Sequence, residues 1–301
     1  DLVRSRGLGD VYKRQLKQYL EDQNYQVKKL QITAEGIPED ARLIVISGPR
    51  LPYQEPEIQA IDHYLGKGGD AVFLLDPLVR TNLEPLLKGY GAEPLAGVVI
   101  DPVNYLAGMD AVGLTIVANQ FYQYHQITSE LKGKLVAFPK TQALRIIGGG
   151  ERGGKWTPLV YSSKTSFLET NLEQLIKYGR VHRDPEDPKG PLVLACAYSE
   201  QIAIKPWETG KHGGEIRIVF LGNDFFMRNM ALEIYSNYLL AINIFNWATG
   251  EQEQAYISPK SRLPSRVFIT NRQTQIIFYS SVLIIPEILC IIGLAIWWRR
   301  K

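Results

Sequence analysis

The 301-residue sequence has few of the residues that build disulfide frameworks and metal sites, with only two cysteines and four histidines. Cys196 lies in an apolar run and Cys290 in the apolar C-terminal segment, so we expect no disulfide framework and two small, buried hydrophobic thiols. The histidines have no partner at i+4 spacing and no acids clustered at ligand spacing. We therefore predict neither a metal site nor a bound cofactor.

The sequence also lacks a large excess of charge of one sign. It has 34 Lys and Arg against 31 Asp and Glu, a net charge of +3. The excess comes from the two ends, which leaves 27 basic and 28 acidic residues, a net charge of −1, for residues 16–275. Such a domain offers no basic surface to a phosphate backbone, so nucleic-acid binding is excluded.

No motif for nucleotide binding or nucleophilic catalysis is complete. Gly149–Trp156 (GGERGGKW) approaches a phosphate-binding loop, but Trp156 stands where Ser or Thr must coordinate Mg²⁺. Both flanking segments are predicted strands, whereas phosphate binding needs a following helix N-terminus, so we interpret the loop as a hairpin turn. Because no G-x-S-x-G or cysteine elbow follows a strand, we predict no catalytic residue and no enzymatic activity.

A long apolar run occupies the C-terminal end. Residues 276–298, IIFYSSVLIIPEILCIIGLAIWW, contain one charged side chain and are followed by the basic residues 299–301. A bilayer core takes roughly 20 apolar helical residues, so the run predicts a transmembrane helix over 276–298. Basic residues stay on the cytoplasmic side, which places residues 299–301 in the cytoplasm. In a bacterium the preceding domain is then extracytoplasmic and tethered to the inner membrane.

Two residues near the middle of this run are unusual. A carboxyl group in hydrocarbon costs on the order of 2.5 to 3.5 kcal/mol, so Glu287 is expected to face another subunit or to be protonated and unpaired. We interpret it as a contact with a membrane partner, and the protonated alternative stays open. Pro286 removes one helical hydrogen bond, so we also expect a bend.

The rest of the chain is expected to have three parts. Residues 1–15, DLVRSRGLGDVYKRQ, have no strand or helix periodicity and resemble a translated sequencing-adapter scar, so we interpret them as foreign. Residues 16–251 are then an extracytoplasmic α/β domain that is truncated at its N-terminus. Residues 252–275, which contain Pro259 and Pro264, are a short stiff linker.

Helical and strand patterns alternate from Leu16 onward, which predicts an α/β fold with a parallel sheet covered by helices. Runs such as ARLIVIS and AVFLL are apolar throughout, as expected for strands buried on both faces. Residues 105–190 are less regular and predict an antiparallel addition at the sheet edge. We predict helices at 16–23, 55–65, 82–90 and 231–247, and strands at 25–32, 41–47, 71–75, 97–100, 114–118, 135–138, 143–147, 159–162, 192–197 and 216–221.

Three acids follow predicted strands directly: Asp76 in LLDP, Asp101 in VIDP and Asp224 in LGNDFF. In an open α/β sheet the carboxyl ends of the strands form the ligand crevice, so these acids are candidate ligand-binding residues. Asp before Pro, or Asp at a helix start, is also ordinary turn and capping chemistry. The structural interpretation is favoured, and the binding interpretation stays open.

The segments LIVISGPRLPYQEPEIQAIDHYLGKGGDAVFLLDP, YGAEPLAGVVIDP, IRIVFLGNDFFMRN, NYLLAINIFNWATGE and PEILCIIGLAIWWRRK follow one another in an order that resembles GldG-type auxiliary subunits of ABC transporters, which are associated with gliding motility. The resemblance covers essentially residues 16–301. It implies a flavodoxin-like domain similar to class I glutamine amidotransferases without their catalytic residues. It also implies a C-terminal anchor, with ABC permease and ATPase subunits as partners.

The chain departs from this family in two places. Family members carry an N-terminal membrane span and a strand before the helix that begins here near Leu16, whereas this chain has residues 1–15. We therefore expect the sheet to lack a central strand. The second departure is Glu287, because the family has an apolar residue after the membrane proline.

Two other hypotheses stay open beside a non-enzymatic auxiliary subunit. One is a membrane-anchored hydrolase or amidotransferase-like enzyme that uses a crevice near Ser47, Asp76 and Asp224. This hypothesis requires a Ser or Cys within hydrogen-bond reach of a histidine held by an acid, and His125 and His63 are the histidines to check. The other is a receptor domain for a sugar or peptide, which a crevice lined by Tyr and Trp would favour.

Overall fold

A ten-stranded mixed sheet forms the centre of the fold in the computed structural model, which describes residues 2–6, 13–30, 32, 36–38, 40–110, 112–150, 152–202, 214–250 and 271–300. Five adjacent strands are parallel, in the order 2-1-3-4-14. They are β2 (Gln26–Lys29), β1 (Leu2–Arg6), β3 (Leu43–Ser47), β4 (Asp70–Leu74) and β14 (Glu215–Leu221). The structure confirms the predicted open α/β sheet, and the strand order is the one found in flavodoxin-like folds.

Antiparallel strands extend the sheet beyond β14. The strand β13 pairs with β14 on one side and with β10 and β11 on the other. The strand β10 also pairs with β5, and β11 with β8. Their bounds are β5 (Ala92–Pro94), β8 (Gln120–Phe121), β10 (Leu144–Ile146), β11 (Lys155–Tyr161) and β13 (Val193–Gln201). The predicted antiparallel addition at one edge is therefore present.

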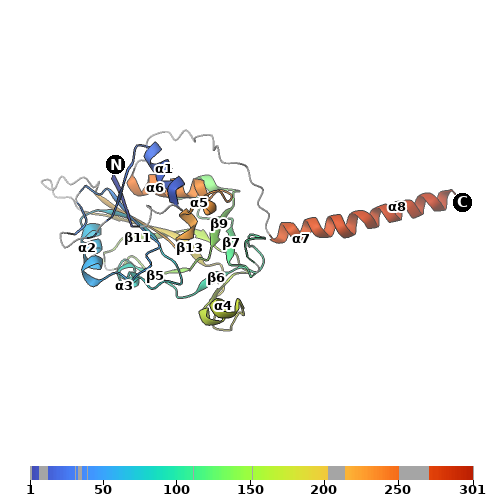
Figure 1. Ribbon diagram of the computed structural model, residues 1–301, viewed down its shortest axis with the longest axis horizontal. Coiled ribbons are helices and arrows are strands. Elements are labelled where there is room, and N and C mark those ends of the chain that lie inside the picture. The colour runs from blue at the N-terminus through green and yellow to red at the C-terminus, as the bar shows by residue number, and fades with distance from the viewer. Residues whose placement is uncertain are drawn as a thin grey trace.

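Helices cover both faces of the sheet, as Figure 1 shows. Side chains alternate along each strand, so Val45 and Val72 belong to one core cluster while Ile44 and Phe73 belong to the other. The first cluster packs under α1 (Arg14–Asp22) and α6 (Asn237–Thr249). The second packs under α2 (Glu55–Gly66) and α3 (Glu84–Gly89). Two buried faces explain why these strands read as continuous apolar runs.

The strand β1 occupies a position that the sequence analysis expected to be empty. Its residues pair in parallel with β2 on one side and β3 on the other. The expectation of a sheet without this central strand was therefore wrong. The facing edges of β2 and β3 have backbone N–H and C=O groups that need hydrogen-bond partners. The backbone of the five-residue strand β1 supplies these partners, whatever the pattern of its side chains.

The middle of the chain differs in detail from the prediction. Two of the expected edge strands, β7 (Thr115–Ala118) and β9 (Val136–Pro139), pair with each other in a separate small sheet. Another small sheet joins β6 (Val98–Ile100) to β12 (Phe167–Glu169), beside α4 (Leu172–Tyr178). The glycine-rich loop before Lys155 leads into β11 and not into a helix, which agrees with rejecting a phosphate-binding loop. It is not a hairpin turn, however, because β10 and β11 each pair with β13.

The predicted helix over 231–247 is broken in two. A short helix, α5 (Asn229–Leu232), ends before Tyr235, whose φ of 48° lies in the left-handed region. The longer helix α6 then begins at Asn237, which is fully buried. The Asn237 side chain accepts a hydrogen bond from the N–H of Ala137 and donates to the carbonyl groups of Ala137 and Ala231. The Asn237 amide thus joins α5, α6 and β9. It can do so because the break between α5 and α6 places Asn237 at the start of α6.

A long apolar helix ends the chain. It consists of α7 (Asn271–Tyr279), a π turn over Ser280–Ile284 and α8 (Ile285–Arg299). Arg272–Arg299 is the one helix in the described part of the chain that is long and apolar enough to cross a membrane. The rest of the described chain buries none of its most apolar 18 residues. The helix begins earlier than the predicted residue 276, and the ribbon runs from α7 into α8 without a sharp kink (Figure 1). The rest of the predicted linker, residues 252–270, lies outside the described residues.

Candidate functional site

The carboxyl ends of β3, β4 and β14 meet at one edge of the sheet because these strands are parallel neighbours. Ser47 is the last residue of β3 and is buried, Asp76 comes two residues after β4, and Asp224 comes three residues after β14. This edge is where open α/β sheets bind ligands. Two of the three acids predicted from the sequence, together with Ser47, therefore lie at the expected edge.

Asp224 is almost fully buried and forms an ion pair with Arg228, with 2.9 Å between Oδ2 and the guanidinium nitrogen. The Arg228 guanidinium also lies over the ring of Phe225, 4.8 Å from its centroid. The turn after β3 passes directly against this carboxylate. A Cβ built on Gly48 would lie 2.4 Å from Asp224 Oδ2, and the φ of Gly48 is +60°. Only glycine allows so close an approach.

Asp76 lies beside this pair. Its Oδ1 accepts a hydrogen bond from the N–H of Leu78 at 2.8 Å, which closes a turn. Burial raises the pKa of Asp76 above its ordinary value, and the negative charge of Asp224 raises it further. The Leu78 N–H and the positive charges of Lys140 and Arg228 oppose that rise in pKa. The edge thus combines two acids with two cations, an arrangement that suits a polar ligand.

Asp101 lies elsewhere and has a structural environment. Its fully buried carboxylate accepts hydrogen bonds from the N–H groups of Val103 and Asn104 and from the hydroxyl groups of Ser163 and Thr165. These bonds join the turn after β6 to the loop before β12. The structure does not bring Asp101 together with Asp76 or Asp224, and its contacts are those of a turn residue.

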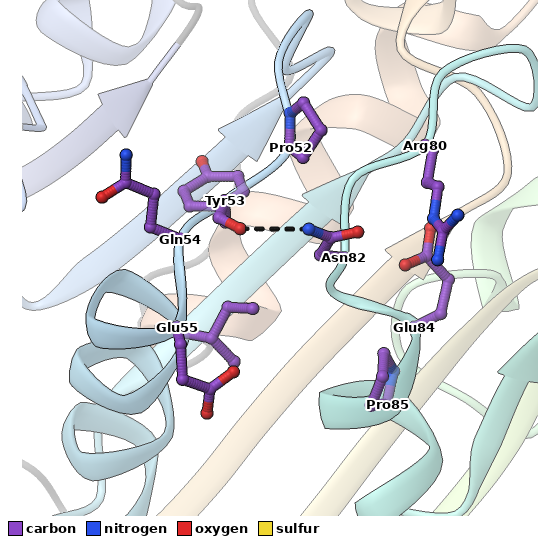
Figure 2. A pocket seen from close by; sticks show the side chains of 9 residues that line it. Pro52, Tyr53, Gln54, Glu55, Arg80, Asn82, Glu84 and Pro85 are labelled. Atoms are coloured by element: carbon purple, nitrogen blue, oxygen red, sulfur yellow. Dashed lines mark hydrogen bonds between the residues drawn. The ribbon is translucent and has the colours of Figure 1, made fainter.

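An open groove lies at the same sheet edge, between the first turns of α2 and α3, and Figure 2 shows its lining. Its volume is about 740 Å³. Two hydrogen bonds hold its walls together: Tyr53 N–H donates to the Thr81 carbonyl at 2.9 Å, and Asn82 Nδ2 donates to the Tyr53 carbonyl at 3.3 Å. The groove is lined by Pro52, Tyr53, Gln54, Glu55, Ile58, Arg80, Asn82, Glu84 and Pro85.

The groove mixes apolar and polar groups. Pro52, Ile58 and Pro85 supply apolar surface, while Gln54 and Asn82 supply amides that both donate and accept hydrogen bonds. One arginine stands against two glutamates, so the groove has no strong charge of either sign. Sequence reasoning missed this groove. The signal that could have located it is a pair of proline-containing helix starts, PYQEPE and NLEP, each after a buried strand.

The histidines do not form a catalytic arrangement in the described part of the chain. His125 Nδ1 accepts a hydrogen bond from Ile127 N–H at 3.2 Å, and its ring lies 5.0 Å from the Trp247 ring. Burial lowers the pKa of His125 to about 4. His63 lies on α2, at a shallow pocket with Asp62 and Arg152.

The nucleophile candidates have other neighbours. Cys196 is fully buried within β13, and burial raises the pKa of its thiol well above the ordinary value. Ser47 is bound by Lys13, whose Nζ donates to Ser47 Oγ at 2.6 Å and to the Ser47 carbonyl at 3.3 Å. Within the described residues, no group of three His, Cys, Asp or Glu side chains is placed to hold a metal ion.

The strand order and the two helix layers define an α/β protein of the flavodoxin-like class. Residues 4–231 match the family described as "ABC-type uncharacterized transport system". Because this match covers more than half of the 301 residues, the chain belongs to that family. No curated protein sequence is similar to the chain.

Solved structures are similar to the chain at low sequence identity. The mmIFT52 N-terminal domain is 16% identical, with a TM-score of 0.57 over 83% of this chain and 97% of its own. A putative ThuA-like protein from Bacteroides uniformis is 12% identical, with a TM-score of 0.45 over 82% of this chain and 89% of its own. A glutamine amidotransferase from Thermotoga maritima is 14% identical, with a TM-score of 0.38 over 83% of this chain and 93% of its own.

Proposed function

We propose that this protein is a non-enzymatic auxiliary subunit of a bacterial ABC-type transport system, of the GldG type associated with gliding motility. The α/β domain lies outside the cytoplasm, and the helix Arg272–Arg299 anchors it in the inner membrane with residues 299–301 in the cytoplasm. The observation that carries this proposal is the combination of a transport-family domain with one exposed apolar helix. ATP hydrolysis is then the task of another chain.

The proposed task of the domain is to bind a substrate or an envelope partner at the edge where β3, β4 and β14 end. The acids Asp76 and Asp224 and the groove between α2 and α3 support this location, because both lie at that edge. The amides of Gln54 and Asn82 beside the apolar groups of Pro52, Ile58 and Pro85 suit a neutral polar ligand such as a sugar or a peptide. Within the groove, hydrogen bonding and apolar contact would determine specificity more than net charge.

Co-purification tests the assignment to a transport system. The chain would be produced with the permease and the ATPase of its own transport operon, then captured in mild detergent through an affinity tag. We expect both partners to be recovered in fixed ratio. Recovery of the chain alone, while the permease and ATPase still associate with each other, would contradict the proposal.

A variant that fills the groove tests the proposed binding surface. Ile58→Trp places an indole between α2 and α3, and Lys132→Trp places the same side chain on an exposed loop as a control. Both variants are expected to fold and to retain the permease. Only Ile58→Trp should fail to restore surface spreading to a deletion strain. Equal restoration by the two variants would remove the groove from the proposal.

A specific geometry supports the second candidate, a membrane-anchored hydrolase or amidotransferase-like enzyme. Lys13 Nζ lies 2.6 Å from Ser47 Oγ, within the reach that a lysine base needs, although Nζ is the donor in this hydrogen bond. The family match is to a transport system and not to a hydrolase, so we favour the non-enzymatic function. Hydrolysis of ester or amide substrates that is lost in Ser47→Ala would reverse this preference.

A further inference from the structure

Glu287 stands near the middle of the apolar C-terminal helix. At 1.5 Å per residue it lies about 18 Å from Arg299 and about 22 Å from Arg272, the two ends of the helix. The most apolar 18 residues of this helix carry at most two charged side chains, and no part of the described chain buries them. If the helix is the membrane anchor of the proposed function, the carboxyl group lies close to the bilayer midplane.

The backbone offers a second polar group at nearly the same depth. In the π turn, the N–H of Ile285 donates to the carbonyl of Ser280, five residues earlier. Pro286 has no N–H, so one carbonyl group of this turn lacks the donor that a regular residue would supply. The hydroxyl groups of Ser280 and Ser281 donate to the carbonyl of Ile277, one turn away. The midplane thus carries a backbone acceptor beside a carboxyl group, and hydrocarbon can satisfy neither.

Glu287 defines one face of the helix. Helical geometry places Cys290, Ile291, Leu294 and Trp298 on the same side as Glu287, because they follow it by three, four, seven and eleven residues. The opposite side carries Leu289, Ile292 and Ile296, which are all aliphatic. Lipid chains can solvate the aliphatic side, whereas the Glu287 side requires a hydrogen-bonding neighbour.

We propose that the Glu287 face packs in the bilayer against a permease helix that carries a hydrogen-bond donor at mid-depth, either a Lys or Arg side chain or an amide. This inference rests on the proposed function and specifies its membrane contact. A second copy of this helix would instead oppose one carboxylate with another, which is repulsive when both are ionised.

The test measures permease recovery with the full chain in mild detergent. Glu287→Leu removes the carboxyl group. The double variant Glu287→Leu/Leu289→Glu restores a carboxyl group within about 3 Å of the same depth but on the opposite side of the helix. We expect both variants to reach the membrane fraction, to keep the thermal unfolding temperature of the α/β domain, and to recover about tenfold less permease than the unaltered chain. Glu287→Gln should retain an intermediate amount.

Equal permease recovery with Glu287→Leu would overturn the inference and leave the proposed function intact. Recovery restored by the relocated carboxyl group would also overturn it, because the interaction would then have no preferred face. Absence of permease from the unaltered chain would instead overturn the proposed function. A bismaleimide that joins Cys290 of two copies, with no permease recovered, would show that this face is a self-association surface.

Discussion

The carboxylate of Asp224 lies directly against the backbone of Gly48, so that a Cβ at position 48 would be 2.4 Å from Asp224 Oδ2. This contact joins the turn after β3 to the turn after β14, across the intervening strand β4. It fixes the two loops that form the sheet edge where we place ligand binding. The local structure around the candidate site therefore depends on one residue without a side chain.

Gly48→Ala should lower the free energy of unfolding by about 2 to 4 kcal/mol, because it adds a left-handed backbone penalty to an overpacked contact. Gly133→Ala is the matched control: Gly133 has a φ of +73°, but a Cβ added there would meet nothing within 4 Å. It should cost only about 1 kcal/mol. Urea unfolding of the detergent-solubilised chain measures both. A similar loss for the two variants would show that the Asp224 contact is unimportant.

Asp70 should make the stability of the domain depend on pH. Burial raises its pKa from 3.8 to about 7, against the N–H of Arg217 and the charges of Arg42 and Arg217, while Glu215 adds to the rise. The folded state therefore holds the proton more tightly than the unfolded chain, and stability falls as pH rises from about 4 to 7.

Asp70→Asn tests this dependence, because the amide keeps an acceptor for the Arg217 N–H and cannot ionise. Relative to the unaltered protein, this variant should gain up to about 4 kcal/mol between pH 4 and pH 8. Unfolding curves at both pH values give the difference. A constant difference between the two proteins would contradict the raised pKa of Asp70.

His125 should make the stability of the domain fall as the pH falls, which is the opposite of the pH dependence expected from Asp70. Its pKa falls from 6.5 to about 4 on folding, because burial disfavours the charged ring. Its contribution to stability is therefore present above pH 6.5 and is lost as pH falls through 4. His125→Gln should reduce the loss of thermal stability between pH 6.5 and pH 4. An unchanged dependence of thermal stability on pH would mean that protonation of the His125 ring does not destabilise the folded domain.

Asn237 is expected to be the most sensitive polar residue of α6. Asn237→Leu removes the side-chain partner of the buried Ala137 N–H and carbonyl groups, while the Ala231 carbonyl still accepts from the Ile234 N–H. It should lower the free energy of unfolding by about 3 to 5 kcal/mol. Asn246→Leu, on the same helix at a half-buried position, should change it by less than about 0.5 kcal/mol. Comparable losses would indicate a general intolerance of α6 to leucine.

The sequence located the strands whose two faces are both buried. Residues 41–47, 71–75 and 216–221 were predicted and correspond to β3, β4 and β14, because burial on both faces requires continuous apolar side chains. The strands β5 and β12 were missed, since their sequences, AEP and FLE, do not belong to a longer apolar run. The strand β1 was missed because its pairing is supplied by its neighbours.

The candidate site was predictable in part for a similar reason. Asp76 and Asp224 follow strands that the sequence identifies, so their shared edge could be inferred. Asp101 follows a strand of the same appearance, but β6 pairs with β12 outside the main sheet. Strand partners are set by long-range contacts that the local pattern does not encode. The groove beside Tyr53 depends on how two helix starts approach each other, which is also a long-range property.

The most direct measurement of the central claim is the side of the membrane on which each end of the anchor lies. Cys196 is buried, and Cys290 is replaced by alanine for this test. A cysteine in place of exposed Lys132 then reports on the domain, and one in place of Arg300 reports on the tail. In spheroplasts treated with a membrane-impermeant maleimide, Lys132→Cys should be labelled at once and Arg300→Cys only after the membrane is permeabilised. The reverse pattern, or release of the chain from membranes by alkaline carbonate, would contradict an extracytoplasmic domain held by a C-terminal span.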